Sequence, residues 1–473
     1  MKSKLLLTAI TFIMGFQFLQ AQYLVSATQI EDRTIAQVQT VLDNGGWETN
    51  SMILNPVISY SITYNTTDVL GNPTIASGAL YVPQLCDMLP LVSYQHGTQL
   101  NSAWVPSTGY FEDRGLLYAG NGFITTLPDY LGMGVNAGMQ HYFHAETEAT
   151  ASIDLIRASK EFLLNSLQIS VNDQVFLSGM SQGGHSTMAV HKYIADHNLE
   201  NEFNVVASAP MSGPYDLSMT QMDFFFEGEN FPQTGFVVYL FASYQNIYGN
   251  LYPSYDYYYD PPYDAIIENW ITNGTAPPAL PNNYYEFMQD SVVDNIVNNP
   301  NHPTRIDASY NDVYNWNPQE SVRMLYCTMD NLVTFENAVL AEDIMNGQGA
   351  PDVEAVDVFT NGDHFTCFIP ATTYSLNWFN SLKIACPLSV PVIKTPPKIM
   401  IYPNPIQSHL MIASDVPIVE INIREVSGRS VFELADSTNI IDEIDVSFLH
   451  VGIYFITLLT DENQSKTVKL IKK

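Results

Sequence analysis

Short apolar runs alternate with longer helix-like stretches through most of this 473-residue chain, and this alternation is the strongest constraint on its fold. Strand-length runs separated by helices are typical of a mostly parallel sheet with helices on both faces, so the sequence predicts an α/β fold. The predicted strands cover residues 89–95, 122–127, 174–178, 203–207, 322–327 and 353–359, and the clearest predicted helices cover 146–164, 182–196 and 335–345. Before them, residues 57–83 alternate apolar and polar side chains around a turn near Gly71, which predicts a β-hairpin.

The stretch from residue 214 to about residue 307 interrupts this alternation between two predicted strands. An insertion of this length in a compact domain is more often a cap or lid than a structureless loop, so we expect a lid. Its aromatic side chains could form the core of the lid or line a pocket for an apolar or aromatic substrate. The most prominent are Phe224, Phe225, Phe226, Tyr252, Tyr255, Tyr257, Tyr258, Tyr259 and Tyr263.

The chain changes character after residue 386. Six prolines fall between Pro387 and Pro405, which is typical of a stiff linker. Beyond the linker, short alternating runs predict a small antiparallel β-sandwich, with strands at residues 398–402, 409–413, 419–425, 431–434, 452–459 and 466–471. We therefore expect a main domain over residues 22–386, a linker over 387–397 and a second domain over 398–473.

The N-terminus has the pattern of a secretory signal peptide over residues 1–21. Lys2 and Lys4 precede an apolar run at residues 5–16, which is too short to span a bilayer. No other segment offers an uninterrupted apolar span, so we expect a soluble, exported protein without a transmembrane segment.

The composition is that of a globular protein, with 46% apolar and 14% charged residues. The net charge of −31 repels phosphate backbones, so nucleic-acid binding is not expected. The electric field of this net charge has little effect on neutral substrates.

Gly179-Met180-Ser181-Gln182-Gly183 fits the G-x-S-x-G pattern. A predicted strand precedes it and a predicted helix follows it, which is the context that a nucleophile elbow requires. On such a tight turn the serine hydroxyl projects above the sheet, and small neighbours let the turn form without collision. Ser181 is therefore the predicted nucleophile.

A serine hydroxyl needs a base to remove its proton, and with this pattern an acid and then a histidine follow the serine along the chain. His364 comes just after the last predicted strand, where a loop could place its ring above Ser181. Asp330 directly follows the preceding predicted strand, and we predict that it is the third member of the triad. Asp216 and Asp363 are the alternatives, although each could simply stabilise a turn.

Attack on an acyl carbon develops a negative oxygen, which two backbone N–H groups should stabilise. One belongs to the residue after the nucleophile, Gln182, and the other to the loop that follows the strand at residues 89–95. In that loop Thr98 is the preferred donor and Gly97 the next choice. We expect His96 to brace the loop rather than to act as a base.

Two further histidines, His141 and His144, precede Glu146 in a spacing that could imitate metal ligands. A zinc site needs three or four ligands with supporting contacts, so we predict no metal and no other cofactor. His185, beside the elbow, is expected to pack or hydrogen-bond locally.

Several spaced motifs together resemble the α/β-hydrolase superfamily and, within it, the secretory lipases. They are the hairpin at residues 57–83, then QHGT, LPDYLG, GMSQGG, DNLVTFENA and DHF, and the resemblance covers about residues 56–385. It implies an esterase or lipase with a lid inserted after the sixth strand. In that group the segment with Asp129 and Tyr130 helps to shape the site, which implies supporting rather than catalytic roles for both.

The C-terminal segment, about residues 398–473, resembles the sorting domain of type IX secretion. Its motifs are YPNP at residues 402–405, a VSGR turn, a GIYF strand and a lysine-rich end. The resemblance implies that the type IX machinery is a partner and that the protein is released or attached at the cell surface.

Four cysteines are candidates for two disulfides in an exported protein, and the sequence alone allows three pairings. In the α/β-hydrolase architecture, strands end at the active-site face and helices return to the opposite face. Cys86 precedes a strand and Cys386 follows the last helix, so both should lie at the opposite face. Cys327 ends a strand and Cys367 follows His364, so both should lie near the site. We therefore predict the pairs Cys86–Cys386 and Cys327–Cys367.

These features predict an exported serine carboxylic-ester hydrolase that acts on a small-molecule, lipid or acylated-polysaccharide ester. A serine peptidase of the same fold is the first alternative, because the same triad cleaves amides. A non-catalytic surface-binding protein is the second, and a lost triad member would mark it.

Overall fold

The computed structural model describes residues 22–47, 53–136, 138–228, 230–386, 399–414, 416–435, 443–460 and 465–473. It divides into two compact units, Met1–Cys386 and Pro387–Lys473, which are described separately below. The expected signal peptide at residues 1–21 and the expected linker at 387–397 lie outside the described residues.

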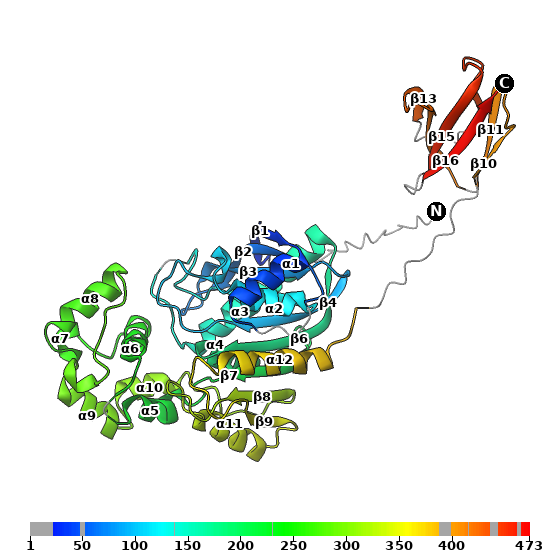
Figure 1. The fold of residues 1–473 in the computed structure, drawn as a ribbon. Coiled ribbons are helices and arrows are strands. Elements are labelled where there is room, and N and C mark those ends of the chain that lie inside the picture. The colour runs from blue at the N-terminus through cyan, green and yellow to red at the C-terminus, as the bar shows by residue number, and fades with distance from the viewer. Residues whose placement is uncertain are drawn as a thin grey trace, which may run out of the picture. The chain divides into compact units, whose positions relative to one another are not determined.

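A nine-stranded sheet forms the centre of the first unit, in the order β1-β2-β3-β5-β4-β6-β7-β8-β9 (Figure 1). The pairs β1 with β2, β2 with β3 and β3 with β5 are antiparallel, and all later neighbours are parallel. The mostly parallel sheet confirms the predicted fold class. The strands are β1 (Leu24–Arg33), β2 (Val57–Thr67), β3 (Pro73–Pro83), β4 (Met88–Gln95), β5 (Ile124–Pro128), β6 (Ser170–Met180), β7 (Val205–Met211), β8 (Ser321–Tyr326) and β9 (Val353–Asp357).

Helices cover both faces of this sheet because successive residues of a buried strand point to opposite sides. In β6, Phe176 packs with α1 (Ile35–Asn44), α2 (Glu112–Gly120) and α12 (Phe368–Leu382). The next residue, Leu177, packs with α3 (Ala145–Phe162) and α4 (Gln182–Asp196), and α11 (Glu336–Gly347) joins α4 in an adjoining cluster. Within the described ranges, no helix combines the length and the apolar character that crossing a membrane requires.

A helical insertion separates β7 from β8. Figure 1 shows its helices, in green, gathered to one side of the sheet. They are α5 (Met222–Phe226), α6 (Thr234–Tyr248), α7 (Tyr255–Tyr258), α8 (Tyr263–Asn273), α9 (Asp290–Asn298) and α10 (Pro303–Ser309). Tyr252, Tyr258 and Tyr259 are buried in a core within the insertion, whereas Tyr257 is exposed. Most of the aromatic residues singled out in the sequence therefore hold the insertion together.

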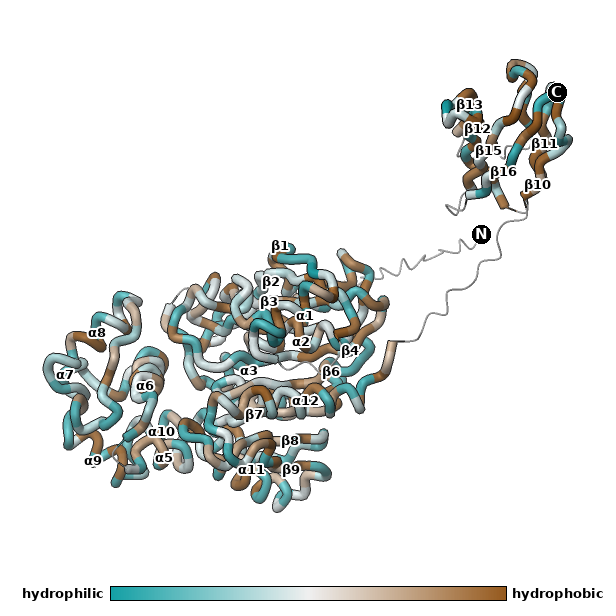
Figure 2. The backbone as a smooth tube through the Cα atoms, viewed as in Figure 1, coloured by the Kyte–Doolittle hydropathy of each residue, from teal (hydrophilic) through white to brown (hydrophobic). Residues whose placement is uncertain are grey.

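The second unit consists of two antiparallel sheets, β10-β11-β14 and β13-β12-β15-β16. Its strands carry many hydrophobic residues (Figure 2), and apolar side chains from both sheets share one core. The six predicted strands are present, and β14 is an additional short one. The bounds are β10 (Ile399–Tyr402), β11 (His409–Ser414), β12 (Ile418–Glu425), β13 (Ser430–Ala435), β14 (Glu443–Asp445), β15 (Gly452–Thr460) and β16 (Ser465–Lys472).

Candidate active site

Ser181 lies at the turn between β6 and α4, with a backbone φ of 62° and ψ of −120°. Residues with a side chain rarely adopt this conformation, so the surrounding structure must hold the turn in place. The backbone N–H of Ser181 donates to the carbonyl oxygen of Met211 in the neighbouring strand β7, at 2.9 Å. The turn lifts the hydroxyl above the carboxyl ends of the parallel strands.

Two glycines are required by the close packing of this turn. A β-carbon on Gly183 would overlap the backbone oxygen of Gln95 at the end of β4. A β-carbon on Gly179 would overlap that same oxygen and the carbonyl oxygen of Gly183. The backbone of β4 thus excludes side chains on both sides of the serine, which is the physical reason for the G-x-S-x-G pattern here.

His364 connects Ser181 to Asp330. The Nε2 atom of His364 lies 2.9 Å from Oγ of Ser181, and its Nδ1 atom lies 2.8 Å from Oδ2 of Asp330. The backbone N–H groups of Leu332 and Val333 each donate to Oδ1 of Asp330 at 2.9 Å, which fixes the carboxylate. A proton on Nδ1 that is held by the carboxylate leaves Nε2 free to accept the proton of the serine.

The two alternative carboxylates are occupied elsewhere. Asp216 accepts hydrogen bonds from the backbone N–H groups of Met219 and Thr220, so it caps a short helical turn. Asp363 accepts from the backbone N–H of Thr366 at 2.8 Å, which is the turn-stabilising role. The structure brings only Asp330, of the three, to the ring of His364.

Both disulfides join the pairs of cysteines expected from topology. Cys327 bonds to Cys367, and the bond links the segment that carries Asp330 to the start of α12, three residues after His364. Cys86 bonds to Cys386, between the start of β4 and the end of α12.

The three predicted oxyanion residues, Gln182, Thr98 and Gly97, surround Ser181. Gln182 is the first residue of α4, where backbone N–H groups have no intrahelical partner. Gly97 approaches closely, because a β-carbon there would lie 3.7 Å from Cβ of Ser181. Thr98 lines the same cavity as Ser181, and its hydroxyl lies 2.6 Å from that of Tyr142.

His96 packs within the loop that carries Gly97 and Thr98. Its ring packs against those of Phe111 and Tyr130, with centroids 4.9 and 4.4 Å away. Because a carbonyl oxygen can only accept, Nδ1 of His96 carries a hydrogen and donates to the carbonyl oxygen of Gly97 at 2.7 Å. Burial lowers the pKa of His96 to about 4, so the ring is neutral at pH 7.

Tyr130 contacts this loop directly, and the carboxylate of the preceding residue, Asp129, joins two other segments. Asp129 is fully buried and accepts hydrogen bonds from the hydroxyl of Ser77 at 2.5 Å and from the backbone N–H of Ser107 at 2.9 Å. Burial raises the pKa of Asp129 to about 6, and these hydrogen bonds partly offset the shift. The hydroxyl of Tyr130 donates to the carbonyl oxygen of His96 at 3.2 Å.

One buried carboxylate near the elbow was missed by the sequence analysis. Glu148, in the first turn of α3, accepts from Nε2 of Gln182 at 2.7 Å and from the hydroxyl of Ser186 at 2.6 Å. It also lies 3.0 Å from Nδ1 of His185. Glu148 therefore ties α3 to the first turn of α4, and a helical pattern alone does not distinguish such a glutamate from a solvated one.

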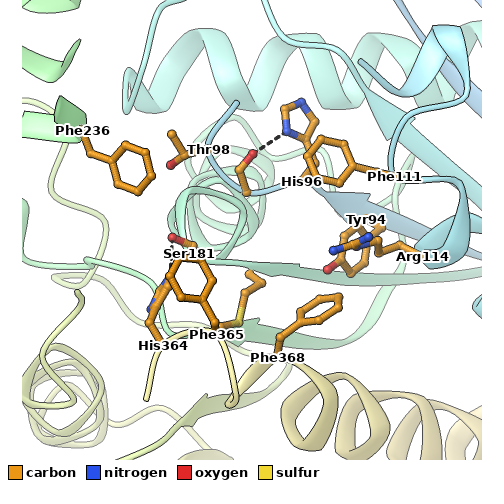
Figure 3. A pocket seen from close by; sticks show the side chains of 12 residues that line it. Tyr94, His96, Thr98, Phe111, Arg114, Ser181, Phe236, His364, Phe365 and Phe368 are labelled. Atoms are coloured by element: carbon orange, nitrogen blue, oxygen red, sulfur yellow. Dashed lines mark hydrogen bonds between the residues drawn. The ribbon is translucent and has the colours of Figure 1, made fainter. Parts of the chain in front are cut away.

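Two cavities adjoin Ser181. The larger, about 190 Å³, is lined mainly by aromatic rings (Figure 3). The smaller, about 20 Å³, is lined by apolar side chains, including Leu240 from the insertion. Phe236 of α6 lines both, so its ring lies where the two cavities meet.

Of the two histidines that could imitate metal ligands, His144 has another partner, whereas Nδ1 of His141 is buried without a hydrogen-bond partner. Nδ1 of His144 accepts from the backbone N–H of Thr147 at 3.3 Å, so His144 caps α3. Burial lowers the pKa of His144 to about 4. In the part of the chain that the structure describes, no three His, Cys, Asp or Glu residues are grouped to hold a metal ion.

Solved structures similar to the first unit include esterases. The rice cell wall degrading esterase LipA from Xanthomonas oryzae is 27% identical with a TM-score of 0.67, and the match covers 76% of this chain and 97% of that chain. A protein from Legionella pneumophila assigned as a hydrolase is 26% identical with a TM-score of 0.69, over 76% of this chain and 98% of that chain. Lipase A from Candida antarctica, at 13% identity and a TM-score of 0.54 over 78% and 84%, shares the fold. No curated protein sequence matches the chain significantly.

Two family profiles match separate parts of the chain. Residues 400–473 match the secretion system C-terminal sorting domain, which indicates secretion or attachment at the cell surface. Residues 115–382, more than half of the chain, match the secretory lipase profile. With the α/β-hydrolase fold and the esterase neighbours described above, these matches lead to one conclusion: the chain belongs to the secretory lipase family and is a carboxylic ester hydrolase.

Proposed function

We propose that Ser181, His364 and Asp330 are the catalytic triad of this ester hydrolase and that the reaction passes through an acyl-enzyme on Ser181. One observation supports this most directly: a continuous chain of hydrogen bonds runs from the serine hydroxyl through the imidazole to a fixed carboxylate. Each of the three residues follows a strand of the parallel sheet, where this architecture places reacting groups.

In the proposed mechanism, Nε2 of His364 takes the proton of Ser181 as Oγ attacks the ester carbonyl carbon. The carbon–oxygen bond to the alcohol then breaks, and His364 returns its proton to the leaving alcohol. His364 then takes a proton from a water molecule as that water attacks the acyl-enzyme, and the carboxylic acid of the ester is released. Asp330 keeps the imidazole in one tautomer and stabilises its protonated form.

The negative oxygen that forms during each step needs donors in place beforehand. We assign this role to the backbone N–H of Gln182 and to that of Thr98, with Gly97 as the alternative. His96, Asp129 and Tyr130 act as positioning residues for the loop. The insertion at about residues 214–307 acts as the lid over the site.

We further propose that residues 1–21 are removed as a signal peptide and that residues 398–473 engage the type IX secretion machinery. The natural substrate is then an ester outside the cell: a small molecule, a lipid or an acylated polysaccharide. The sorting match and the secretory family support this assignment.

A fluorophosphonate probe tests the nucleophile. Wild-type protein should be labelled on one serine, and Ser181→Ala should lose both the label and at least about 10⁴-fold of its activity on p-nitrophenyl acetate. Ser381→Ala, which changes an exposed serine on α12, is the matched control and should keep both. Rapid mixing with the acetate ester followed by intact mass measurement should detect one added acetyl group.

An unlabelled wild type would contradict the proposed triad and would favour a non-catalytic binding protein. Labelling with hydrolysis of p-nitroanilides but not of p-nitrophenyl esters would favour a peptidase.

A further inference from the structure

Arg114 is the only arginine or lysine among the residues that line the larger cavity, all of which the structure describes. It belongs to α2, on the side of Ser181 away from Phe236 (Figure 3). In a chain with 18 basic and 49 acidic residues, a guanidinium at the reactive site is an uncommon placement that calls for an explanation.

The guanidinium of Arg114 is held by two aromatic rings and a carboxylate. Its carbon lies 4.5 Å from the ring centre of Phe368 and 5.2 Å from that of Phe111. Nη1 donates to the carboxylate of Asp113, which also accepts from the indole N–H of Trp47 at 2.9 Å. About a quarter of the Arg114 side chain stays exposed, so it is fixed in position yet still reachable from the cavity.

Phe111 has a backbone feature that points to a role in this cavity. Its φ is 61°, in the left-handed region, at the residue before α2. For a residue with a large side chain this conformation is strained, and such strain tends to collect at functional sites. Phe111 places its ring between His96 and Arg114, so the strained residue links the loop of the oxyanion donors to the guanidinium.

The chemistry of the guanidinium indicates what it can bind. Because Asp113 already balances its charge, Arg114 suits a neutral hydrogen-bond acceptor better than a second anion. Tyr94, beside it, stays a neutral hydroxyl: burial raises its pKa far above the usual value, and the charge and hydrogen bond of Arg114 only partly oppose this. The other walls are mainly aromatic rings, which favour a planar ring in the ligand.

The sizes of the two cavities limit the ester further. A cavity of about 150 Å³ accommodates benzene, so about 190 Å³ holds one six-membered ring with a short arm. The second cavity that Ser181 lines, about 20 Å³, has room for a group of methyl size. The ester therefore has one small side and one ring-bearing side.

We infer that the larger cavity binds an aromatic ring carrying a neutral oxygen substituent, such as a hydroxyl or methoxyl group, and that Arg114 donates a hydrogen bond to that oxygen. This inference rests on the proposed function, since the ring must be one part of an ester attacked by Ser181. The ring can belong to the acid or to the alcohol, and the recognition chemistry is the same in both.

Two matched substrate pairs test the inference and show whether the ring belongs to the acid or to the alcohol of the ester. The first is methyl 4-methoxycinnamate against methyl cinnamate, with the ring on the acid; the second is 4-methoxyphenyl acetate against phenyl acetate, with the ring on the alcohol. In one pair, wild type should favour the methoxylated ester in kcat/KM by about tenfold, the size expected for one hydrogen bond from a charged donor. Arg114→Met should bring that ratio close to one.

The ratio of the two kcat/KM values is measured within each variant. A smaller fraction of folded protein lowers both values equally and therefore does not change the ratio. Arg157→Met is the control, because Arg157 is also ion-paired and also lies over aromatic rings, but away from the site. It should keep the wild-type ratio. Arg114→Lys keeps a positive charge opposite Asp113 and replaces Arg114→Met in the test if that variant does not fold. Its preference for the methoxylated ester should lie between those of wild type and Arg114→Met.

Two results would overturn the inference. One is a wild type without preference in either pair, and the other is an Arg114→Met variant that keeps the preference. If the wild type is still labelled by the fluorophosphonate and hydrolyses all four esters, the proposed triad stands and only the role of Arg114 fails. Absence of labelling would instead contradict the triad.

Discussion

The site has two sides that are built differently. On the sheet side, Ser181, Asp330 and His364 follow β6, β8 and β9 and are held by backbone hydrogen bonds over a few residues. On the insertion side, Phe236 and its neighbours come from helices that pack mainly on each other, in an aromatic core of their own.

Backbone strain follows the same division. Outside the insertion, positive φ angles at residues other than glycine occur at Phe111, Tyr130, Phe143, Ser181 and Ser212 around the site and also at Gln168, Asp173 and Asn198 away from it. Across the described residues of the insertion, only glycines have such angles. The comparison suggests that the sheet side sets the chemistry with a rigid, strained backbone, while the insertion shapes the space around the substrate. Changes on the two sides should therefore have different consequences.

The largest difference is expected from Asp330→Asn on the sheet side. An amide in place of the carboxylate favours the wrong imidazole tautomer, so kcat on p-nitrophenyl acetate should fall by about 10⁴-fold with little change in KM. Asp216→Asn is the matched control, because Asp216 caps a helical turn at the start of the insertion. It should retain activity within a fewfold. An Asp330→Asn enzyme within tenfold of wild type would remove the proposed difference between the two sides.

The disulfide on the sheet side should matter next. Cys327 and Cys367 are 40 residues apart, and closing a loop of that length stabilises the folded chain by about 4 kcal/mol. The double variant Cys327→Ser, Cys367→Ser should lose about that much unfolding free energy in urea. It should also lose kcat, since Asp330 and His364 are no longer tied together.

The second disulfide is the control for that experiment. Replacing Cys86 and Cys386 by serine should lower stability by at least as much, because their separation is 300 residues. This second double variant should keep a kcat near that of wild type when kcat is expressed per folded molecule. The folded molecules are counted by fluorophosphonate titration. Equal losses of kcat in both double variants would contradict a specific role for the bond near the site.

The pH dependence of the unfolding free energy should reveal the contribution of the buried carboxyl of Asp129. The pKa of Asp129 is raised to about 6, so the stability linked to its proton is fully present below about pH 4 and is lost as the pH rises through 6. The loss approaches about 3 kcal/mol. Asp129→Asn should therefore lose less unfolding free energy than wild type between pH 4 and pH 7.5, as measured by urea titration.

Asp312, where the chain returns from the insertion, extends this test. Its pKa is also raised to about 6, mainly by burial, and it accepts hydrogen bonds from Ser218. Asp312→Asn should flatten the pH dependence of stability in the same direction, but only Asp129→Asn should also lower kcat. A variant of Asp129 with the pH slope of wild type would show that its carboxyl does not titrate in this range.

Much of the sheet side could be predicted because its signals are local. The turn at Ser181 needs small residues on both sides, and strand-length runs precede both Asp330 and His364. The order of parallel strands then predicts that their ends meet. By contrast, β1 was not predicted, since most of this edge strand is exposed and its residues do not alternate.

The insertion side could not be predicted in the same detail. Its helix α6 is buried over a continuous stretch from Val237 to Tyr244, so it lacks the polar face that marks a surface helix. Arg114 and Glu148 were missed for a related reason: each owes its position to residues far away in the chain, such as Phe368 or Gln182. No spacing in the sequence encodes contacts of this kind.

The smallest effect is expected on the insertion side, where Phe236 lines both cavities beside Ser181. Phe236→Ala should join the two spaces, so the ratio of kcat/KM for p-nitrophenyl octanoate to that for p-nitrophenyl acetate should rise by about three- to tenfold, because a few methylene groups gain apolar contacts. The rate of labelling by a small fluorophosphonate should stay within about twofold, since no reacting group moves.

Phe224→Ala is the matched control. Phe224 is a half-buried phenylalanine of the same insertion that lines neither cavity, so its replacement should leave the ratio unchanged. If Phe236→Ala instead slowed labelling as strongly as Asp330→Asn slows turnover, the insertion would take part in the chemistry and the division between the two sides would be wrong.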